Sequence, residues 1–277
     1  MLPWLALAAM MGAGGEPSPC PSAPYAVDAS THSYGADSES EALDLYLPHG
    51  ASRAPIVVYI HGGAWVGGDK SDYVNLGEAF ARCGIAAAIL NYPLAPQTPA
   101  AGQAGKLADA LAWLRTHAPQ ARYDPARTFL IGHSAGAQLA WFALVDGLAS
   151  RSSVAGVIAL GAVGINPSSD VTTLAPQYQG IYDPAFGSDR SQWARFDVKP
   201  KLRGTEPPSL VIHGANDDMA PEAISRQLYE QLKAAGDAVQ YLQPAGRGHW
   251  DMIEALARPG DATMGQIERF VLGKTVE

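Results

Sequence analysis

The sequence predicts an α/β fold in which helices cover both faces of a mostly parallel sheet. Short β-rich runs alternate with longer helix-compatible stretches, which is the pattern of βαβ units. Several of these runs are almost continuously apolar, as expected for strands that are covered on both faces. The 277 residues, 47% of them hydrophobic, suit one compact core and are too few for two large ones.

The predicted elements follow one another in alternating order. The strand candidates are rich in β-branched and apolar residues, and they span residues 43–47, 56–60, 86–91, 128–131, 154–160, 209–213 and 239–243. The helix candidates carry apolar residues at helical spacing, and they span residues 75–83, 101–117, 135–148, 221–235 and 264–272.

Residues 163–208 break this alternation. The segment lacks clear periodicity, is interrupted by proline and glycine, and contains several aromatic residues: Tyr178, Tyr182, Phe186, Trp193 and Phe196. Long irregular segments inside a compact domain are usually functional. We therefore predict an insertion or small cap over the carboxyl ends of the strands, where open α/β sheets place their sites.

The strongest chemical signal is the sequence GHSAG at residues 132–136. It follows an apolar strand candidate and precedes a helix candidate, which is the setting of a nucleophile elbow. Such a sharp turn lifts the serine hydroxyl above the sheet and leaves room only for small residues two positions before and after it. The pattern predicts that Ser134 is a nucleophile.

A second glycine-rich motif, HGGAW at residues 61–65, ends the strand candidate 56–60. The tetrahedral intermediate of acyl transfer needs backbone N–H donors aimed at its oxyanion. We expect these donors at Gly63, Ala64 and Ala135. The alternative for the motif is a plain turn that ends the strand.

A serine hydroxyl needs a general base, and the base needs a carboxylate to orient it. In this type of site the chain order is serine, acid, histidine. Of seven histidines, only His213 and His249 follow Ser134, and His213 precedes the acid candidates. The order therefore favours His249, which we expect in a loop after the strand candidate 239–243; the alternative is a surface histidine.

The acid must lie between nucleophile and base. The candidates include Asp146, Asp170, Asp183, Asp189, Asp197, Asp217, Asp218 and Asp237. Only Asp217 and Asp218 lie in a turn directly after a buried strand candidate and before a helix candidate.

The stretch HGANDDMAP at residues 213–221 resembles the acid-bearing turn of α/β-hydrolase esterases, in which the carboxylate is the fifth residue. The resemblance places the acid on Asp217 and leaves Asp218 to cap or solvate the turn. Together with HGGAW, GGDK at 67–70, NYPLAP at 91–96, GHSAG and Gly248-His249, it is similar to the carboxylesterase branch related to hormone-sensitive lipase, acetylxylan and feruloyl esterases and kynurenine formamidase.

This resemblance covers about residues 43–272, and its motifs specify the catalytic machinery and not the substrate. Two positions depart from the pattern. Ala64 stands where many relatives have a third glycine, which a backbone donor tolerates. Pro93 replaces a common arginine, so the contact of that arginine cannot be carried over.

The resemblance implies a serine esterase that forms an acyl-enzyme with a Ser134–His249–Asp217 triad and needs no cofactor or metal. We expect short acyl esters, including acetyl or feruloyl esters of plant polysaccharides, as small-molecule or oligosaccharide substrates. An amidase or formamidase is the alternative on the same triad; a peptidase or a non-catalytic binding protein is less favoured. Trp65, Tyr92 and Trp250, together with Trp193, either line the substrate pocket or belong to the core.

Composition limits the remaining possibilities. A net charge of −8 gives no basic excess for nucleic acid or anionic membranes. Cys20 and Cys83 allow at most one disulfide and match no zinc-ligand spacing, and a small buried side chain is favoured over a reactive thiol at Cys83. The sequence leaves the oligomeric state and the pairing of the cysteines open.

The first residues resemble a targeting segment. An apolar run at residues 2–11 precedes small residues and a Pro/Ser-rich stretch, the order of a secretory signal and its cleavage region. We therefore expect residues 1–24 to be a signal and flexible segment of a secreted or periplasmic protein, with a disordered N-terminus of a cytoplasmic protein as the alternative. Residues 25–277 then form the α/β-hydrolase catalytic domain, with the cap at 163–208.

Overall fold

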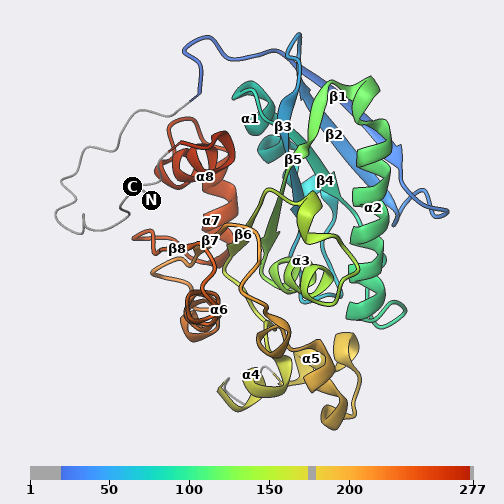
Figure 1. The fold of residues 1–277 in the computed structure, drawn as a ribbon, viewed down its shortest axis with the longest axis vertical. Coiled ribbons are helices and arrows are strands. Elements are labelled where there is room, and N and C mark those ends of the chain that lie inside the picture. The colour runs from blue at the N-terminus through green and yellow to red at the C-terminus, as the bar shows by residue number, and fades with distance from the viewer. Residues whose placement is uncertain (1–19, 174–178, 275–277) are drawn as a thin grey trace.

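The structure of the protein, a computed structural model, describes residues 20–173 and 179–274. Its centre is an eight-stranded sheet with the order β1-β2-β4-β3-β5-β6-β7-β8 (Figure 1). The strands from β4 to β8 pair in parallel, and β2 is antiparallel to both β1 and β4. This architecture confirms the predicted α/β fold.

All the predicted strands are present, and one more precedes them. The bounds are β1 Val27–Ser33, β2 Ala42–Pro48, β3 Ala54–Ile60, β4 Ala86–Leu90, β5 Tyr123–His133, β6 Gly156–Leu160, β7 Ser209–Ile212 and β8 Val239–Leu242. The sequence did not reveal β1 because it is an edge strand that reads VDASTHS and is mostly exposed, so it carries no apolar run.

The predicted helices are also present, together with shorter ones. Their bounds are α1 Val74–Arg82, α2 Ala100–Ala121, α3 Ala135–Val145, α4 Pro167–Thr173, α5 Gln179–Phe186, α6 Glu222–Ala235, α7 His249–Leu256 and α8 Ala262–Leu272. Four 3₁₀ turns accompany them in the described residues: η1 Lys70–Tyr73, η2 Arg151–Ser153, η4 Arg190–Phe196 and η5 Lys199–Lys201.

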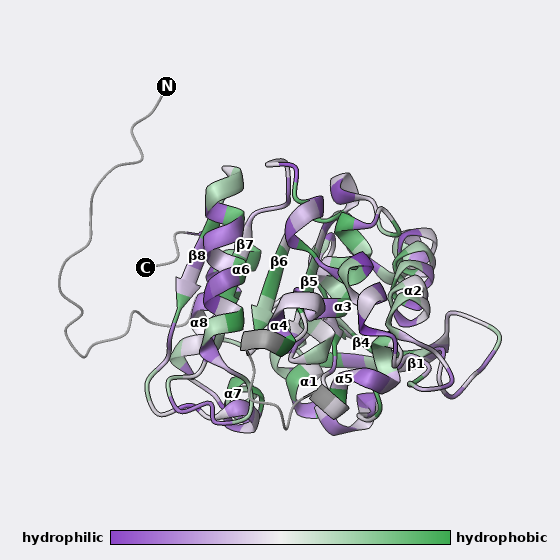
Figure 2. Cartoon of the chain, turned by 90° about the horizontal axis from the view of Figure 1, so that it is seen from below, coloured by the Kyte–Doolittle hydropathy of each residue, from purple (hydrophilic) through white to green (hydrophobic). Residues whose placement is uncertain are grey.

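The sheet separates two hydrophobic cores, and its central strands are apolar (Figure 2). In β3, Ile56, Val58 and Ile60 face one core, and Val57 and Tyr59 face the other. Helices α2, α3 and α6 cover the first face, and α1, α7 and α8 cover the second. Because both faces are covered, the strands are apolar at nearly every position.

One predicted loop is a helix. His249 was expected in a loop after β8, but it is the first residue of α7, which begins directly after Gly248. This helix is short and buries Met252, Ile253 and Leu256 against the second core. Two turns of helix give too few residues for a clear helical period in the sequence.

Residues 163–208 contain α4, α5, η4 and η5, which lie together below the sheet in Figure 1; Tyr178 falls outside the described residues. Aromatic side chains form the interior of this cap, with Phe186 contacting the rings of Tyr182, Trp193 and Phe196 at centroid distances of 5.6, 5.8 and 5.0 Å. The helices were not predicted because this packing, and not a regular apolar stripe, stabilises them.

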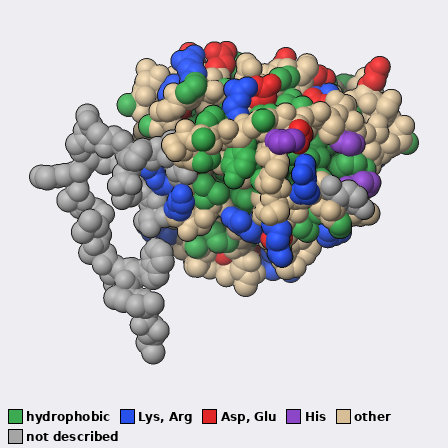
Figure 3. All heavy atoms as spheres, turned by 90° about the horizontal axis from the view of Figure 1, so that it is seen from above, with side chains coloured by type: hydrophobic (Ala, Val, Ile, Leu, Met, Phe, Trp, Pro, Cys, Tyr) green, Lys and Arg blue, Asp and Glu red, His purple; other side chains and the backbone are tan. Residues whose placement is uncertain are grey.

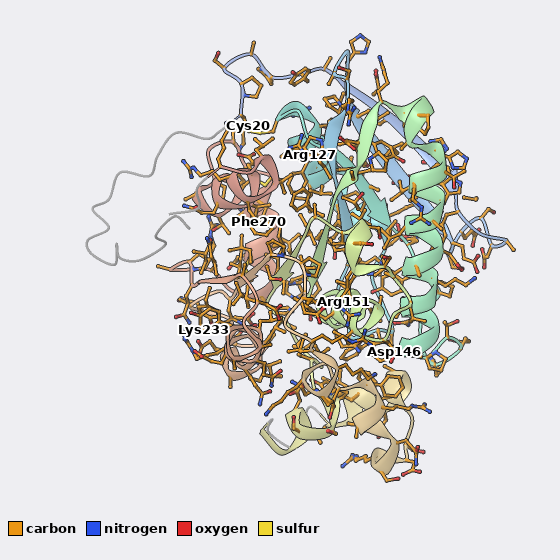
Figure 4. All side chains as sticks on the ribbon, viewed as in Figure 1. Cys20, Arg127, Asp146, Arg151, Lys233 and Phe270 are labelled. Atoms are coloured by element: carbon orange, nitrogen blue, oxygen red, sulfur yellow. A yellow bond between two sulfur atoms is a disulfide. The ribbon has the colours of Figure 1, made fainter. Side chains whose placement is uncertain are left out.

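Two ion pairs join the segment around the cap to the end of α3 and the turn after it. Lys201 donates to Asp146 at 2.7 Å, and Arg151 donates to Glu206 at 2.6 Å. The side chain of Glu206 has no exposed surface. Figure 4 labels Asp146 and Arg151 at this junction.

Cys20 and Cys83 form a disulfide with a sequence separation of 63 residues. It joins the start of the described chain to the end of α1, and Cys20 lies close to α8 (Figure 4). No helix in the described ranges has the length and apolarity to cross a bilayer. On the face opposite the cap, acidic and basic side chains are interspersed (Figure 3).

Candidate active site

The predicted elbow is a sharp turn between β5, which ends at His133, and α3, which begins at Ala135. Ser134 lies at its apex with φ 53° and ψ −121°, a conformation that is strained for any side chain. A Cβ at Gly136 would lie 2.1 Å from the carbonyl oxygen of Ile60, and one at Gly132 would lie 2.4 Å from that of Gly136. Only glycine therefore lets this turn close.

The HGGAW loop follows β3 and has three successive residues in the left-handed region. The φ angles are 111° at Gly63, 52° at Ala64 and 64° at Trp65. The carbonyl oxygen of Gly63 accepts hydrogen bonds from the N–H groups of Val66 and Gly67, which fixes the turn. Within the described residues, the N–H groups of Gly63, Ala64 and Ala135 donate to no other group, so all three predicted oxyanion donors are available.

Trp65 holds this strained loop in place. Its indole N–H donates to Gln138 at 3.1 Å, and its carbonyl oxygen accepts from the side chain of Gln103 at 2.8 Å. Its ring is fully buried and packs edge-on against Tyr182 and Phe186 of the cap, with centroids 5.2 and 4.9 Å away. The conformation of the loop therefore depends on contacts with both α3 and the cap.

Asp217 follows β7, and its buried carboxylate is saturated with donors. Oδ1 accepts from the N–H groups of Met219 and Ala220 at 3.0 and 2.8 Å, and Oδ2 lies 2.7 Å from Nδ1 of His249. Burial raises the pKa of Asp217, but the hydrogen bonds from His249 and Ala220 outweigh it and hold the pKa below its usual value. The carboxylate is therefore ionised, as an orienting group must be.

The expectation that Asp218 caps the acid turn is wrong. Asp217, and not Asp218, caps the backbone N–H groups of the turn. Asp218 is exposed and lines the neighbouring pocket.

His249 is 5% exposed and shares a pocket with Ser134. Its Nδ1 is engaged by Asp217, which leaves Nε2 for the hydroxyl. No hydrogen bond joins Ser134 and His249 among the described side chains, and such bonds often form only when substrate is bound.

Two further histidines surround the site. Burial, and the neighbouring His249, lower the pKa of His133 to about 3, so this ring stays neutral. Burial also lowers the pKa of His213, whose Nδ1 lies 3.0 Å from the Ser225 hydroxyl and whose Nε2 lies 4.0 Å from Asp217. Only His249 among these rings faces the pocket, which agrees with its selection by chain order.

The pocket has a volume of about 390 Å³ and is mostly apolar. Its lining residues are Gly63, Ala64, Trp65, Ser134, Val163, Ile181, Tyr182, Asp218, Met219, Pro221, His249 and Trp250.

The pocket includes two of the aromatic residues that the sequence put forward, Trp65 and Trp250, and omits Tyr92 and Trp193. Tyr92 is buried behind the oxyanion loop, where its hydroxyl donates to the carbonyl oxygen of His61 at 2.7 Å. Trp193 belongs to the interior of the cap. These two are core residues and not pocket residues.

The other apolar wall residues are Val163, Ile181, Tyr182, Met219 and Pro221, and the sequence analysis assigned none of them individually to a substrate pocket. The first three belong to the flagged segment 163–208, so its length was the available signal. Met219 and Pro221 follow the acid turn directly and could have been found from that position.

One group of side chains in the described ranges has the spacing of metal ligands, namely Cys20, Cys83 and Glu268. Its two cysteines are joined in the disulfide and cannot act as thiolate ligands. The group lines a different cavity from the one that contains Ser134.

Comparison with family models gives two matches. The model of the prolyl oligopeptidase family matches residues 101–260, which include Ser134, Asp217 and His249. A model described as BD-FAE matches residues 43–154, which include the HGGAW and GHSAG motifs.

Known proteins are similar over most of this chain. A probable isoprenylcysteine alpha-carbonyl methylesterase of Oryza sativa subsp. japonica is 27% identical over 240 residues, covering 79% of this chain and 57% of that protein. Kynurenine formamidase of Danio rerio is 26% identical over 228 residues, covering 80% and 75%. The chain thus spans less than two thirds of the length of the rice relative.

Among solved structures, esterase B of Lactobacillus rhamnosis aligns with a TM-score of 0.75 and 22% identity, covering 88% of this chain and 85% of that one. At this level of identity the likeness establishes a common α/β-hydrolase fold.

Proposed function

Since this chain belongs to the prolyl oligopeptidase family and has the α/β-hydrolase fold, we propose that it is a serine esterase acting on carboxylic esters of small acyl groups. The observation that carries the proposal is that Ser134, His249, Gly63 and Ala64 line one pocket, and that the N–H groups of Gly63, Ala64 and of Ala135, which directly follows Ser134, have no other acceptor among the described residues. The rice relative, which is named a methylesterase, supports ester chemistry.

In the first half of the reaction, His249 takes the proton of Ser134 through Nε2 while Asp217 holds its Nδ1–H. The serine oxygen attacks the ester carbonyl, and the N–H groups of Gly63, Ala64 and Ala135 stabilise the oxyanion. His249 then gives its proton to the leaving alcohol, and an acyl-enzyme remains.

In the second half, His249 removes a proton from water, which attacks the acyl-enzyme through the same oxyanion site. Ser134 recovers its proton and the acid is released. The strained turns at Ser134 and at residues 63–65 fix these groups before substrate arrives, so little reorganisation accompanies the reaction.

A fluorophosphonate probe combined with Ser134→Ala tests the proposal. The probe should label Ser134 in the native protein, and Ser134→Ala should lower kcat for a short-chain ester by about 10⁴ or more with unchanged circular dichroism. Labelling at another serine, or substantial activity in the variant, would refute the assignment.

Substrate class is tested with a panel of acetyl, butyryl, long-chain and feruloyl esters. The pocket of about 390 Å³ favours short acyl groups. Acetyl and feruloyl esters of plant polysaccharides are tested in the same panel as substrates with a neutral alcohol part. Faster turnover of long-chain than of short-chain esters would contradict the size argument.

An amidase acting on the same triad is the second candidate, since kynurenine formamidase is among the relatives. Formylkynurenine and a proline-containing peptide substrate belong in the same panel. Higher kcat/KM on either of these than on every ester would make amide hydrolysis the function.

We further propose that the protein is exported, because a disulfide persists best in an oxidising compartment. The expected signal and flexible segment, residues 1–24, lies almost wholly outside the described residues. N-terminal sequencing after expression in a bacterial host should find a mature chain that begins after the apolar run 2–11 and still contains Cys20, which the disulfide requires, and an intact N-terminus in the cytoplasm would contradict export.

A further inference from the structure

The charged groups that line the pocket around Ser134 include a carboxylate and no lysine or arginine. Among its lining residues Asp218 is the single carboxylate, and none of them is lysine or arginine. Apart from Ser134 and His249, the other side chains of the wall are apolar or aromatic. The carboxylate therefore acts on a pocket whose walls provide little other polar surface.

A neighbouring hollow is also lined by negatively charged side chains. Its volume is about 320 Å³, and it shares Trp250 with the active-site pocket. Its charged lining residues are Asp72 and Glu254, again with no lysine or arginine. Trp250 thus lines two hollows, each of which has a carboxylate and no lysine or arginine in its lining.

These carboxylates are not neutralised within the described part of the chain. The side chains of Asp72, Asp218 and Glu254 form none of its ion pairs, whereas Asp44, Asp124, Asp261 and Glu206 are each paired with lysine or arginine. Their negative potential therefore extends into the space that a substrate enters.

Aromatic rings complete the environment. Trp250 is 46% exposed, which is unusual for so large an apolar side chain, and Tyr182 and Trp65 line the same pocket. Aromatic faces attract organic cations, and the attraction strengthens where water is partly excluded. Apolar rings beside an unpaired carboxylate suit an alkylated ammonium group, which is both cationic and hydrophobic.

The position of Asp218 and Trp250 also indicates which part of the ester they contact. The leaving oxygen must receive its proton from His249, so the alcohol part of the substrate lies on the His249 side. The ring centroid of Trp250 lies 5.7 Å from that of His249, and both residues line the pocket together with Asp218.

We propose that this site selects esters whose alcohol part carries an alkylammonium group, with Asp218 and Trp250 as the specificity-determining residues. The inference rests on the proposed esterase function and names its substrate class. In this arrangement a quaternary or protonated ammonium group lies beside Trp250 and is attracted by the negative charge of Asp218.

A pair of isosteric substrates isolates the effect of charge. Choline butyrate and 3,3-dimethylbutyl butyrate differ in a quaternary nitrogen against a quaternary carbon, and neither alcohol part donates a hydrogen bond. We expect kcat/KM to favour the choline ester by about three- to tenfold at low salt. The preference should fall at 0.5 M NaCl, because salt screens partly exposed charges.

Two substitutions that each remove one negative charge test whether Asp218 is the source of the preference for the choline ester. Asp218→Asn should bring the ratio of the two kcat/KM values close to one. Glu230→Gln removes the same charge from an exposed position on α6, outside the active-site pocket, and should keep the native ratio. Trp250→Leu should lower the ratio by a smaller factor.

Binding to Ser134→Ala, measured by calorimetry, separates this inference from the esterase proposal. Tighter binding of the choline ester than of its isostere, lost in Ser134→Ala/Asp218→Asn, supports the inference even if the native protein hydrolyses neither ester. Equal kcat/KM values for both esters overturn the inference and leave the esterase proposal standing. A preference that survives in Asp218→Asn also overturns it.

Discussion

The turns that end β3, β5 and β7 differ from the cap at residues 163–208 in how they are encoded. Each turn is built from a few consecutive residues whose backbone conformation fixes the chemistry, as in the elbow that only Gly132 and Gly136 allow. The cap is built from residues that are distant in a segment without periodicity, as in the hydrogen bond from the Lys199 N–H to the side chain of Asn166, 33 positions away. Its order comes from packed rings such as Phe186 on Phe196.

This difference indicates that the turns determine the rate of the reaction and that the cap determines stability and selectivity. The turns supply the proposed nucleophile, acid and oxyanion donors, and such groups can serve acyl transfer on many substrates. The cap supplies Val163, Ile181 and Tyr182 to the pocket wall and so contributes to its shape. We therefore expect substitutions in the turns to change rate, and substitutions in the cap to change stability and selectivity.

One residue connects the two regions. Trp65 belongs to the oxyanion loop, yet its ring packs on Tyr182 and Phe186 of the cap. Left-handed backbone at Ala64 and Trp65 costs of order 1 to 3 kcal/mol per residue and persists only when the surroundings compensate for it. Substitution of Trp65 should therefore change both the rate and the selectivity of the reaction.

The largest effect is expected within the acid turn. Asp217→Asn should lower kcat by about 10³ to 10⁴ with little change in KM, because the amide cannot hold the imidazole in the required tautomer and charge. Asp218→Asn should lower kcat for a neutral ester by less than tenfold. Steady-state kinetics on a short-chain ester, with melting curves to confirm folding, measures both.

The comparison between these neighbours has a clear contrary result. If Asp218→Asn is the inactive variant and Asp217→Asn the active one, the register of the acid turn is wrong by one residue. If both variants remain active, the acid lies elsewhere and Asp217 has a structural role only.

An intermediate effect is expected in the cap. Phe186→Ala should lower the free energy of unfolding by about 3 to 5 kcal/mol, because it leaves a cavity among four buried rings. It should lower kcat about tenfold through the loosened contact with Trp65. Chemical denaturation and steady-state kinetics measure the two effects.

Ile181→Ala is the matched control in the same helix. Its side chain is 40% exposed, so the loss of stability should be about 1 kcal/mol or less. A kcat for Phe186→Ala as low as that of Asp217→Asn would show that the cap and the catalytic turns cannot be treated as separate regions.

The smallest effect concerns pH and Asp170, a buried residue of α4. Burial, reinforced by the negative charge of Asp197, raises the pKa of Asp170 from 3.8 to about 7 in the folded protein. The folded state therefore binds this proton more tightly than the unfolded state, so the stabilisation is complete below pH 3.8 and is lost as the pH rises to about 7.

Asp170→Asn removes this dependence. Its melting temperature relative to the native protein should rise between pH 5 and pH 8, by an amount that corresponds to about 2 to 4 kcal/mol. Asp189→Asn, at an exposed site in the same cap, changes a capping contact and should shift the melting temperature by the same amount at pH 5 and at pH 8. A constant difference between Asp170→Asn and the native protein over this pH range would contradict the buried, protonated carboxyl.

The sequence by itself determined the α/β fold and the order of the main strands and helices, because continuous apolar runs and helical spacing are local patterns. It also identified Ser134, His249, Asp217 and the oxyanion loop as candidates, and the structure brings the first two to one pocket and joins Asp217 to His249. Ser134, Asp217 and the HGGAW loop lie in turns at strand ends, and His249 begins the helix that follows the last strand; parallel strands place such connections at one edge of the sheet.

Only the tertiary structure decided what surrounds these groups. Tyr92 and Trp250 are both aromatic residues next to a motif, yet one is buried behind the oxyanion loop and the other is exposed in the pocket. The disulfide, the edge strand β1 and the helices of the cap depend in the same way on partners that are distant in the chain. Local patterns report which element a residue belongs to, whereas burial and contact depend on how the elements pack, and one sequence contains no direct record of that packing.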